Sequence, residues 1–280
     1  METVFLVTFP TRVAWDLAFS IGRKVEKTAQ KSSPYINKNK LFWLLFNMEN
    51  KEEFRYCYKY PHAALTADCV IFGFDGKNLN ILLIERGIYP YKGCWAFPGG
   101  FMNMDETMEQ CAMRELKEET GLADAFIKQF HVFSGVTRDP RERVVTCAFL
   151  ALVNLQEVRG GDDAAQAKWF PLDQTPPLAF DHDHILRVAL KHLKEKIHFE
   201  PIGFELLPEE FTMTQLQTLY EAILEVQFDR RNFAKKFLKL ELIQPVEIDK
   251  KEGSNRHVIY YKFNKEKYDE LKSKGFRLEF

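Results

Sequence analysis

The stretch that decides the fold runs from Gly100 to Leu122 and reads GFMNMDETMEQCAMRELKEETGL. It predicts a helix over residues 106–120, because Gly121 stands just beyond the last helical position, where glycine commonly ends a helix in the left-handed conformation. Apolar residues recur along this helix every four positions, which is the spacing of a face that packs against a core.

Three glutamates, Glu115, Glu118 and Glu119, share one side of this helix, with the second and third within about 60° of the first. Their arc overlaps the apolar face, so we expect the carboxylates to border the core. Like charges four positions apart destabilise a helix by a few tenths of a kcal/mol, and burial raises that cost. A divalent cation would relieve the repulsion. Carboxylate ligands without His or Cys favour Mg²⁺ or Mn²⁺ over zinc.

An isolated ExxEE segment is more often a solvated charged face than a metal site. Here, however, nine positions match the whole signature of the Nudix family, G-x5-E-x7-R-E-U-x-E-E-x-G-U, in which U is apolar. From typical residue usage, chance agreement anywhere in the chain is on the order of 10⁻⁷. The chain therefore resembles Nudix hydrolases over residues 60–197. The matching positions are Gly100, Glu106, Arg114, Glu115, Leu116, Glu118, Glu119, Gly121 and Leu122.

The resemblance implies an α/β/α sandwich around a mixed sheet, and attack of water on a diphosphate linked to another moiety. It implies that the three helix glutamates bind Mg²⁺ or Mn²⁺ with help from the backbone carbonyl of Gly99, and that Glu106 and Arg114 brace the loop against the helix. Such a cation neutralises phosphate charge and lowers the pKa of the attacking water. The predicted catalytic residues are Glu106, Arg114, Glu115, Glu118 and Glu119.

Residues outside the signature are candidates for contact with the substrate. Arg86 ends a predicted strand where Nudix proteins often place a phosphate-reading basic residue, although a surface arginine is an equal alternative. The loop TRDPRER, residues 137–143, is densely polar, and loops of that kind disproportionately carry function. Glu142 in this loop is a candidate general base. The predicted substrate-binding residues are Arg86, Arg138, Asp139 and Arg143.

The rest of this region predicts an α/β fold. Residues 65–74, 80–86 and 144–153 are rich in β-branched and aromatic side chains and predict strands of a buried sheet. Asp75 and Gly76 predict a hairpin between the first two strands. A second helix is predicted over residues 183–196.

Composition bounds the classes of protein that remain. With 46% hydrophobic residues and a net charge of −1, the chain should fold and offers no overall attraction to nucleic acid or to an anionic membrane. No apolar run approaches the roughly 18 residues of a membrane span. Five cysteines without a CxxC pair favour buried thiols and a cytoplasmic location over a disulfide framework or a zinc site.

A different pattern begins after Pro201. Residues 211–224 and 229–243 predict two helices, the first capped by Thr212 or Thr214. Two strands joined by a four-residue loop at 252–255 follow. Helix, turn, helix and hairpin is the order of a winged helix.

The second of these helices has a cationic face. Arg231, Lys235 and Lys239 follow one another at intervals of four, whereas Phe233 and Phe237 occupy the opposite side. A solvated helix face is the alternative to a DNA-binding surface. Lys250 and Lys251 add charge beside the predicted wing. The predicted DNA-binding residues are Arg231, Asn232, Lys235, Lys236, Lys239 and Arg256.

A Nudix domain followed by a winged helix resembles the Nudix-related transcriptional regulators of bacteria, with the match extending over residues 55–280. In that family the Nudix domain senses a metabolite such as ADP-ribose or a sugar, and the dimeric protein binds a palindromic double-stranded operator. Many members have a broken signature, whereas this one is complete. Three alternatives therefore remain: a regulator that only senses, a regulator that also hydrolyses its effector, and a plain Nudix hydrolase with a C-terminal dimerisation domain.

The predicted domains are a Nudix domain over residues 55–200 and a winged helix over 201–280. Residues 1–54 form an N-terminal extension. Met48 begins a polar segment typical of a protein N-terminus, which favours the interpretation that residues 1–47 precede the natural start.

Overall fold

A computed structural model describes residues 60–122, 125–155, 158, 164–246, 258–275 and 278. All elements below belong to one compact unit, residues 62–280. The predictions for the N-terminal extension, for the hairpin loop and for Lys250, Lys251 and Arg256 lie outside the described residues.

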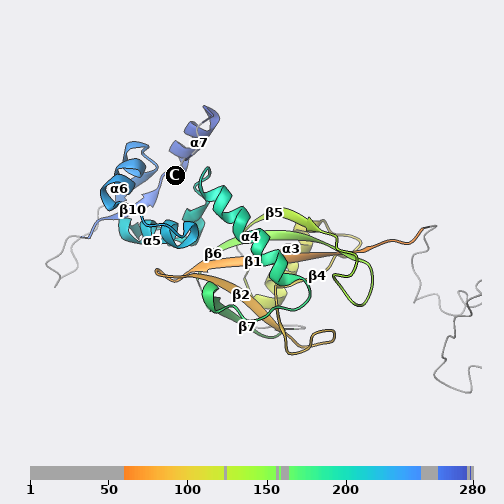
Figure 1. Cartoon of the computed structure of the whole chain (residues 1–280). Helices are drawn as coiled ribbons and strands as arrows, with labels where there is room; N and C mark the ends of the chain where they lie inside the picture. The colour runs from red at the N-terminus through yellow and green to blue at the C-terminus, as the bar shows by residue number, and fades with distance from the viewer. Residues whose placement is uncertain are drawn as a thin grey trace, which may run out of the picture. The chain divides into compact units, whose positions relative to one another are not determined.

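The first part of this unit is built on a mixed sheet (Figure 1). Its strand order is β3-β2-β1-β6-β5, with β4 paired to β1 and β7 paired to β2. The pairing of β1 with β6 is parallel, and the other pairs are antiparallel. The predicted hairpin between the first two strands is confirmed. The strands are β1 (Ala64–Phe74), β2 (Leu79–Arg86), β3 (Trp95–Ala96), β4 (Gly99–Phe101), β5 (Phe126–Phe133), β6 (Val144–Asn154) and β7 (Ala164–Pro171).

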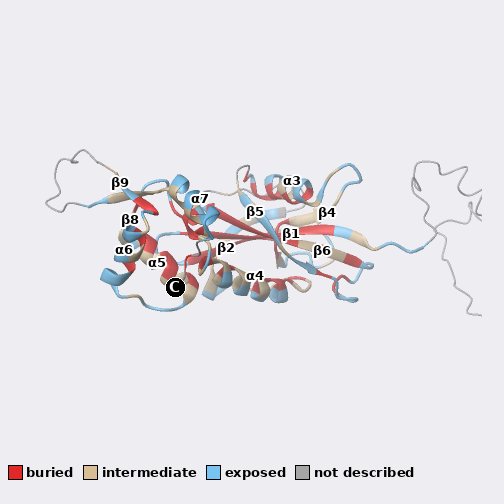
Figure 2. Cartoon of the chain, turned by 90° about the horizontal axis from the view of Figure 1, so that it is seen from above, coloured by how far each residue is buried: buried red, intermediate tan, exposed pale blue. Residues whose placement is uncertain are grey.

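Two helices cover opposite faces of this sheet, α3 (Met108–Thr120) and α4 (His182–Ile197) (Figure 2). Side chains alternate along β1, as the period of a strand requires. Cys69 and Ile71 pack with α3, whereas Val70 and Phe72 pack with α4. The predicted α/β/α sandwich is confirmed, and it explains why β1 is apolar on both faces. A short helix, η1 (Leu172–Gln174), follows β7.

Local chemistry fixes both ends of α3. The Thr107 side chain accepts a hydrogen bond from Gln110 N while the Gln110 side chain accepts one from Thr107 N, forming a capping box. Gly121 ends the helix with φ 76°, a left-handed conformation that glycine adopts without strain. The predicted end is confirmed, and the start lies two residues later than predicted.

The second part contains the winged helix. Its elements are η2 (Ile202–Leu206), β8 (Phe211–Thr212), α5 (Met213–Leu224), α6 (Arg230–Lys239), β9 (Ile243–Val246), β10 (Tyr260–Phe263) and α7 (Lys265–Ser273), with sheet order β8-β10-β9. Thr212 caps α5 in a second capping box. The prediction that the next helix reaches residue 243 is wrong: Glu241 adopts φ 55°, which turns the chain, and Ile243 begins a strand.

One hydrophobic cluster joins the two parts. It includes Phe72 of β1, Ile197 of α4, Tyr220 of α5 and Phe237 of α6, each with 0% of its surface exposed. The winged helix is therefore packed against the Nudix sheet through a continuous core.

The cysteines follow the prediction in part. Cys69 and Cys111 are buried, and Cys147 is half-buried. Cys94 is exposed, contrary to the prediction, because it lies in the turn that precedes β3. Within the described segments, no helix is long and apolar enough to cross a membrane.

Candidate functional site

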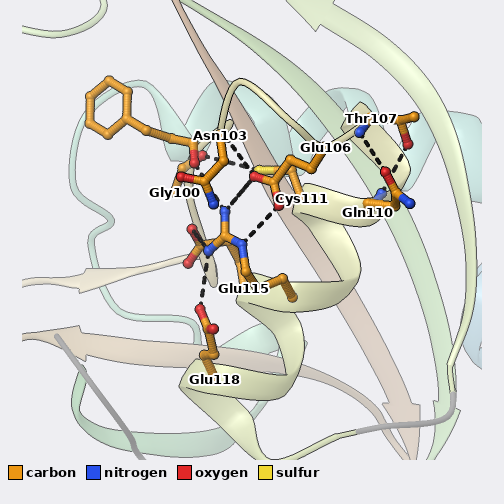
Figure 3. Close-up of polar contacts among 10 residues, drawn as sticks. Gly100, Asn103, Glu106, Thr107, Gln110, Cys111, Glu115 and Glu118 are labelled. Carbon is orange, nitrogen blue, oxygen red and sulfur yellow. Dashed lines mark hydrogen bonds and ion pairs between the residues drawn. The ribbon is translucent and has the colours of Figure 1, made fainter. Parts of the chain in front are cut away.

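The guanidinium of Arg114 on α3 contacts three carboxylates, those of Glu106, Glu115 and Glu118, which Figure 3 labels. Its Nε and Nη2 donate to the two oxygens of Glu106 at 2.9 and 2.7 Å. Its Nη1 donates to Glu115 at 2.7 Å and to Glu118 at 3.1 Å. Arg114 lowers the pKa of Glu106 to about 2. The pair implied by the family resemblance therefore ties the loop before α3 to the helix.

Glu119 is the most deeply buried of these carboxylates, with 5% of its surface exposed. Its Oε2 accepts a hydrogen bond from Gly99 N at 2.8 Å. Burial, with smaller contributions from Glu115 and Asp68, raises the pKa of Glu119 to about 8. Burial also raises the pKa of Glu115. The helix thus holds carboxylates whose ionised forms are unfavourable without a cation.

The two glycines of β4 make room for this cluster. A Cβ added to Gly100 would overlap the carboxylate of Glu115, and one added to Gly99 would overlap the backbone carbonyl of Ala67. Glycine at both positions therefore lets the strand approach β1 on one side and the carboxylates on the other.

The donor set suits a divalent cation by its chemistry, since it offers hard carboxylate oxygens and like charges that a cation would neutralise. Among the described residues, however, no three His, Cys, Asp or Glu side chains converge as metal ligands. Arg114 draws Glu115 and Glu118 to itself, and Glu119 is bonded to Gly99. The carboxylates must leave these partners to share one ion.

A cavity of about 600 Å³ opens beside the cluster. The predicted residues Gly99, Arg114, Glu115, Glu118 and Glu119 all line it, whereas Glu106 does not and is paired with Arg114. The other residues of the wall are Thr66, Asp68, Ile84, Arg86, Ile88, Phe97, Gly100, Phe101, Asn103, Arg138, Asp139, Arg141, Phe180 and His182.

The residues predicted to bind substrate divide into two groups. Arg86, Arg138 and Asp139 line the cavity. Arg143 does not line it; it is exposed and donates to the carbonyl of Gly135 at 3.0 Å. Glu142, the candidate general base, is also exposed and does not line the cavity. The structure therefore does not support a substrate contact by Arg143 or a general-base role for Glu142.

Arg138 and Asp139 already have protein partners. Arg138, with 9% of its surface exposed, donates to Asp181 at 2.8 and 3.1 Å and to Asp68 at 3.3 Å. Asp139 accepts from the Nε and Nη2 of Arg141 at 3.0 and 2.7 Å. Their first role is to fix the loop that carries them.

The cationic face predicted on α6 is present. Arg231, Asn232, Lys235 and Lys239 are exposed, and Lys236 is half-buried. Phe233 and Phe237 lie in the core, with 3% and 0% of their surfaces exposed. The Asp229 side chain caps the helix by accepting from Asn232 N at 2.9 Å. The helix thus presents a row of cations to solvent.

Comparisons with known proteins agree with both halves of this description. A model of the Nudix domain matches residues 62–190, and one of the NrtR DNA-binding winged helix domain matches residues 203–263. A relative from Acinetobacter baylyi, "ADPR responsive transcriptional repressor NtrR", is 33% identical over 215 residues, which cover 75% of this chain and 86% of the relative. The chain belongs to the Nudix-related transcriptional regulators.

Two further matches place this regulator among its relatives. The crystal structure of Shewanella oneidensis NrtR complexed with a 27mer DNA is 27% identical, with a TM-score of 0.64, and the match covers 76% of this chain and 97% of that one. The ADP-ribose pyrophosphatase of Methanocaldococcus jannaschii is 43% identical over 46% of this chain and 73% of its own. The Nudix domain therefore has hydrolase potential, and its family uses divalent metal ions.

Sequence reasoning missed much of the wall of the regulator's cavity, including the polar or aromatic residues Asp68, Arg141, Phe180 and His182. Asp68 is a charged residue inside an apolar strand, and that contrast could have revealed it. His182 begins α4, accepts from Phe97 N through Nδ1 at 3.0 Å, and has its Nε2 3.9 Å from Asp68. Burial lowers the pKa of His182, which favours the neutral ring. No local pattern distinguished Arg141 from Arg143.

Proposed function

We propose that this protein is a cytoplasmic transcriptional regulator that binds a double-stranded operator as a homodimer and senses ADP-ribose through its Nudix domain. One observation carries the proposal: a complete Nudix cavity and an exposed cationic helix occur in one chain, which resembles a named repressor along 215 residues. The exposed side chains of α6 supply the positive charge that phosphate contacts need.

The cavity favours a nucleoside diphosphate sugar over a free sugar. Its volume of about 600 Å³ lies within the range of small-molecule sites, roughly 300–1,000 Å³. Carboxylates and guanidiniums together line its wall, and a free sugar would leave the carboxylate cluster without a function. Both the Acinetobacter repressor and the Methanocaldococcus enzyme are named for ADP-ribose, which makes it the first ligand to test.

We further propose that the regulator hydrolyses this ligand with Mg²⁺ or Mn²⁺. Glu115, Glu118 and Glu119 would hold the ion, and a bound ion would supply an activated water and neutralise phosphate charge. The chain's own contribution is positional: Arg114 and Glu106 fix the loop, and the Gly99 N–H orients Glu119. Exposed Glu118, with 41% of its side chain accessible, is the carboxylate freest to turn toward the cavity.

Turnover of ADP-ribose tests the enzymatic half. Wild-type protein with Mg²⁺ should release AMP and ribose 5-phosphate, and Glu119→Gln should lose this activity by more than about 100-fold, since metal ligation commonly contributes several kcal/mol to catalysis. Glu109→Gln is the matched control, because Glu109 lies exposed on the same helix outside the cluster. Activity retained by Glu119→Gln would contradict the assignment.

The alternative is a Nudix hydrolase whose C-terminal domain only dimerises, and the complete signature with the 43% identity to a pyrophosphatase favours it. Selection of duplexes from a random-sequence pool separates the two. A regulator should enrich a palindromic site, and ADP-ribose should change its affinity for that site. Failure to enrich any duplex above background would support the hydrolase alternative.

A further inference from the structure

A second group of side chains, one cationic and two aromatic, lies in the cavity wall apart from the carboxylate cluster. It consists of Arg141 and the rings of Phe101 and Phe180, all of which line the cavity. The Arg141 Cζ lies 5.1 Å from the centroid of the Phe101 ring and 5.8 Å from that of Phe180. Guanidinium groups stack on aromatic faces in this way and keep their in-plane donors available.

Asp139 fixes the orientation of Arg141. It accepts from Nε and Nη2, and it also accepts from the Arg141 backbone N–H at 2.9 Å. The Asp139 side chain has 3% of its surface exposed, whereas that of Arg141 has 36%. A buried carboxylate therefore holds one edge of a guanidinium whose remaining edge is accessible.

The balance of charge distinguishes Arg141 from two other arginines of the wall. Arg114 contacts three carboxylates and Arg138 contacts two, so both are largely neutralised by the protein. Arg141 contacts one. An anion entering the cavity gains more from Arg141 than from either of the others.

The backbone at Phe180 and at Tyr91, whose ring contacts that of Phe180, is in a strained conformation. Phe180 has φ 54° and Tyr91 has φ 61°, a conformation that is costly for residues with a side chain. Their rings contact each other with centroids 4.7 Å apart. Strain of this kind persists where the surroundings impose it, and it clusters at ligand sites.

Thr66 supplies an independent sign of a missing partner. It lines the cavity with 7% of its surface exposed, and its Oγ1 has no hydrogen-bond partner among the described residues. Thr66 pairs across the sheet with Phe101, the residue whose ring lies against Arg141, so their side chains are neighbours on one face. An unsatisfied buried hydroxyl is costly, and a ligand oxygen would satisfy it.

We propose that Arg141 and Thr66 form a phosphate-binding subsite of the cavity, with Asp139, Phe101 and Phe180 holding Arg141 in place. The inference rests on the proposed function, because the diphosphate of ADP-ribose supplies the anion. The free edge of Arg141 donates to a phosphate oxygen, and the Thr66 hydroxyl donates to the same group.

Calorimetric titration in metal-free buffer tests the subsite without turnover, with ADP-ribose and inorganic pyrophosphate as separate probes. Arg141→Gln should weaken both by about 10- to 100-fold, the value of a charge-assisted hydrogen bond. Thr66→Val should weaken both by about 5-fold, and Thr66→Ser should restore them, since it keeps the hydroxyl. Arg187→Gln removes an exposed arginine of α4 and should bind as the wild type does.

The outcomes separate the subsite from the proposed ligand. Wild-type binding of ADP-ribose that Arg141→Gln and Thr66→Val both retain would overturn the subsite and leave the proposed function standing. Binding of pyrophosphate but not of ADP-ribose, lost in Arg141→Gln, would support the subsite and contradict ADP-ribose as the ligand. Wild-type protein that binds neither probe would overturn the subsite, and the turnover assay with Mg²⁺ then decides the proposed function. Urea denaturation of each variant identifies any that fails to fold, and the Thr66 pair then decides alone.

Discussion

Replacing Arg114 with methionine should destabilise the protein and, at the same time, strengthen its hold on a divalent cation. Methionine keeps much of the apolar stem but removes the group that contacts Glu106, Glu115 and Glu118. Three carboxylates are then left to repel one another, and a cation becomes the remaining means of neutralising them.

The magnitude follows from the exposure of each pair. The side chains of Glu106 and Glu115 are 11% and 13% exposed, so their contacts resemble buried pairs, whose disruption costs about 3–5 kcal/mol. Glu118 is 41% exposed, and its pair contributes under about 1 kcal/mol. Arg114 itself is 27% exposed, which reduces the total. We expect Arg114→Met to lower the free energy of unfolding by about 2–3 kcal/mol without metal.

Urea denaturation with and without saturating Mg²⁺ measures both effects. If the proposed metal site is correct, a cation in the wild type would compete with Arg114 for Glu115 and Glu118, so Mg²⁺ should stabilise Arg114→Met by more than it stabilises the wild type. The gap between the two proteins should therefore narrow. Arg187→Met is the surface control and should change stability by less than about 0.5 kcal/mol. A gap that Mg²⁺ leaves unchanged or widens would refute the competition.

Three other predictions concern the loop, the DNA and the pH. Glu106→Gln should have a lower free energy of unfolding than the wild type at pH 7. Because Arg114 lowers the folded-state pKa of Glu106 from 4.5 to about 2, this difference in stability should hold above about pH 5 and shrink as the pH falls from about 4.5 toward 2. A difference that does not depend on pH would contradict the ion pair. The double variant Lys235→Ala with Lys239→Ala should weaken binding to a selected duplex and reduce the salt dependence of that binding by about two released counterions. The control, Lys77→Ala with Lys92→Ala, changes two exposed lysines outside the winged helix and should have no effect. An unchanged salt dependence in the first variant would show that α6 does not contact the DNA. Arg143→Gln should retain wild-type affinity for ADP-ribose, and a loss as large as that of Arg141→Gln would restore the sequence-based assignment.

The sequence predicted elements whose signals are local. The helix predicted over residues 211–224 is an example: Leu216, Leu219, Tyr220 and Ile223 follow helical spacing in the sequence, and all four side chains are buried. The end of α3 could be predicted because Gly121 marks it in the sequence. In contrast, α7 was missed, and the predicted end of α6 lies four residues too late, because the left-handed turn at Glu241 contains no glycine that would have marked it in the sequence.

In the candidate site, too, the residues that could be predicted are those whose arrangement is set locally. Its carboxylates come from one helix, so their spacing in the sequence is also their arrangement in space. The rest of the wall comes from β1, from the loop before β6 and from the start of α4, which only the fold brings together. Arg141 and Arg143 are two positions apart and chemically identical, and the choice between them depends on Asp139 and Phe101, which pure sequence reasoning does not place.

The continuous core beneath both domains has a consequence for thermal unfolding. Phe72 of the sheet and Phe237 of the cationic helix α6 belong to one apolar cluster, so neither domain can unfold without exposing surface that the other covers. The two domains should therefore unfold in a single cooperative transition, for which the calorimetric and van't Hoff enthalpies agree. Free energy gained by a ligand in the cavity then stabilises the winged helix equally, and a temperature shift seen by a probe on α6 reports occupancy of a site in the other domain.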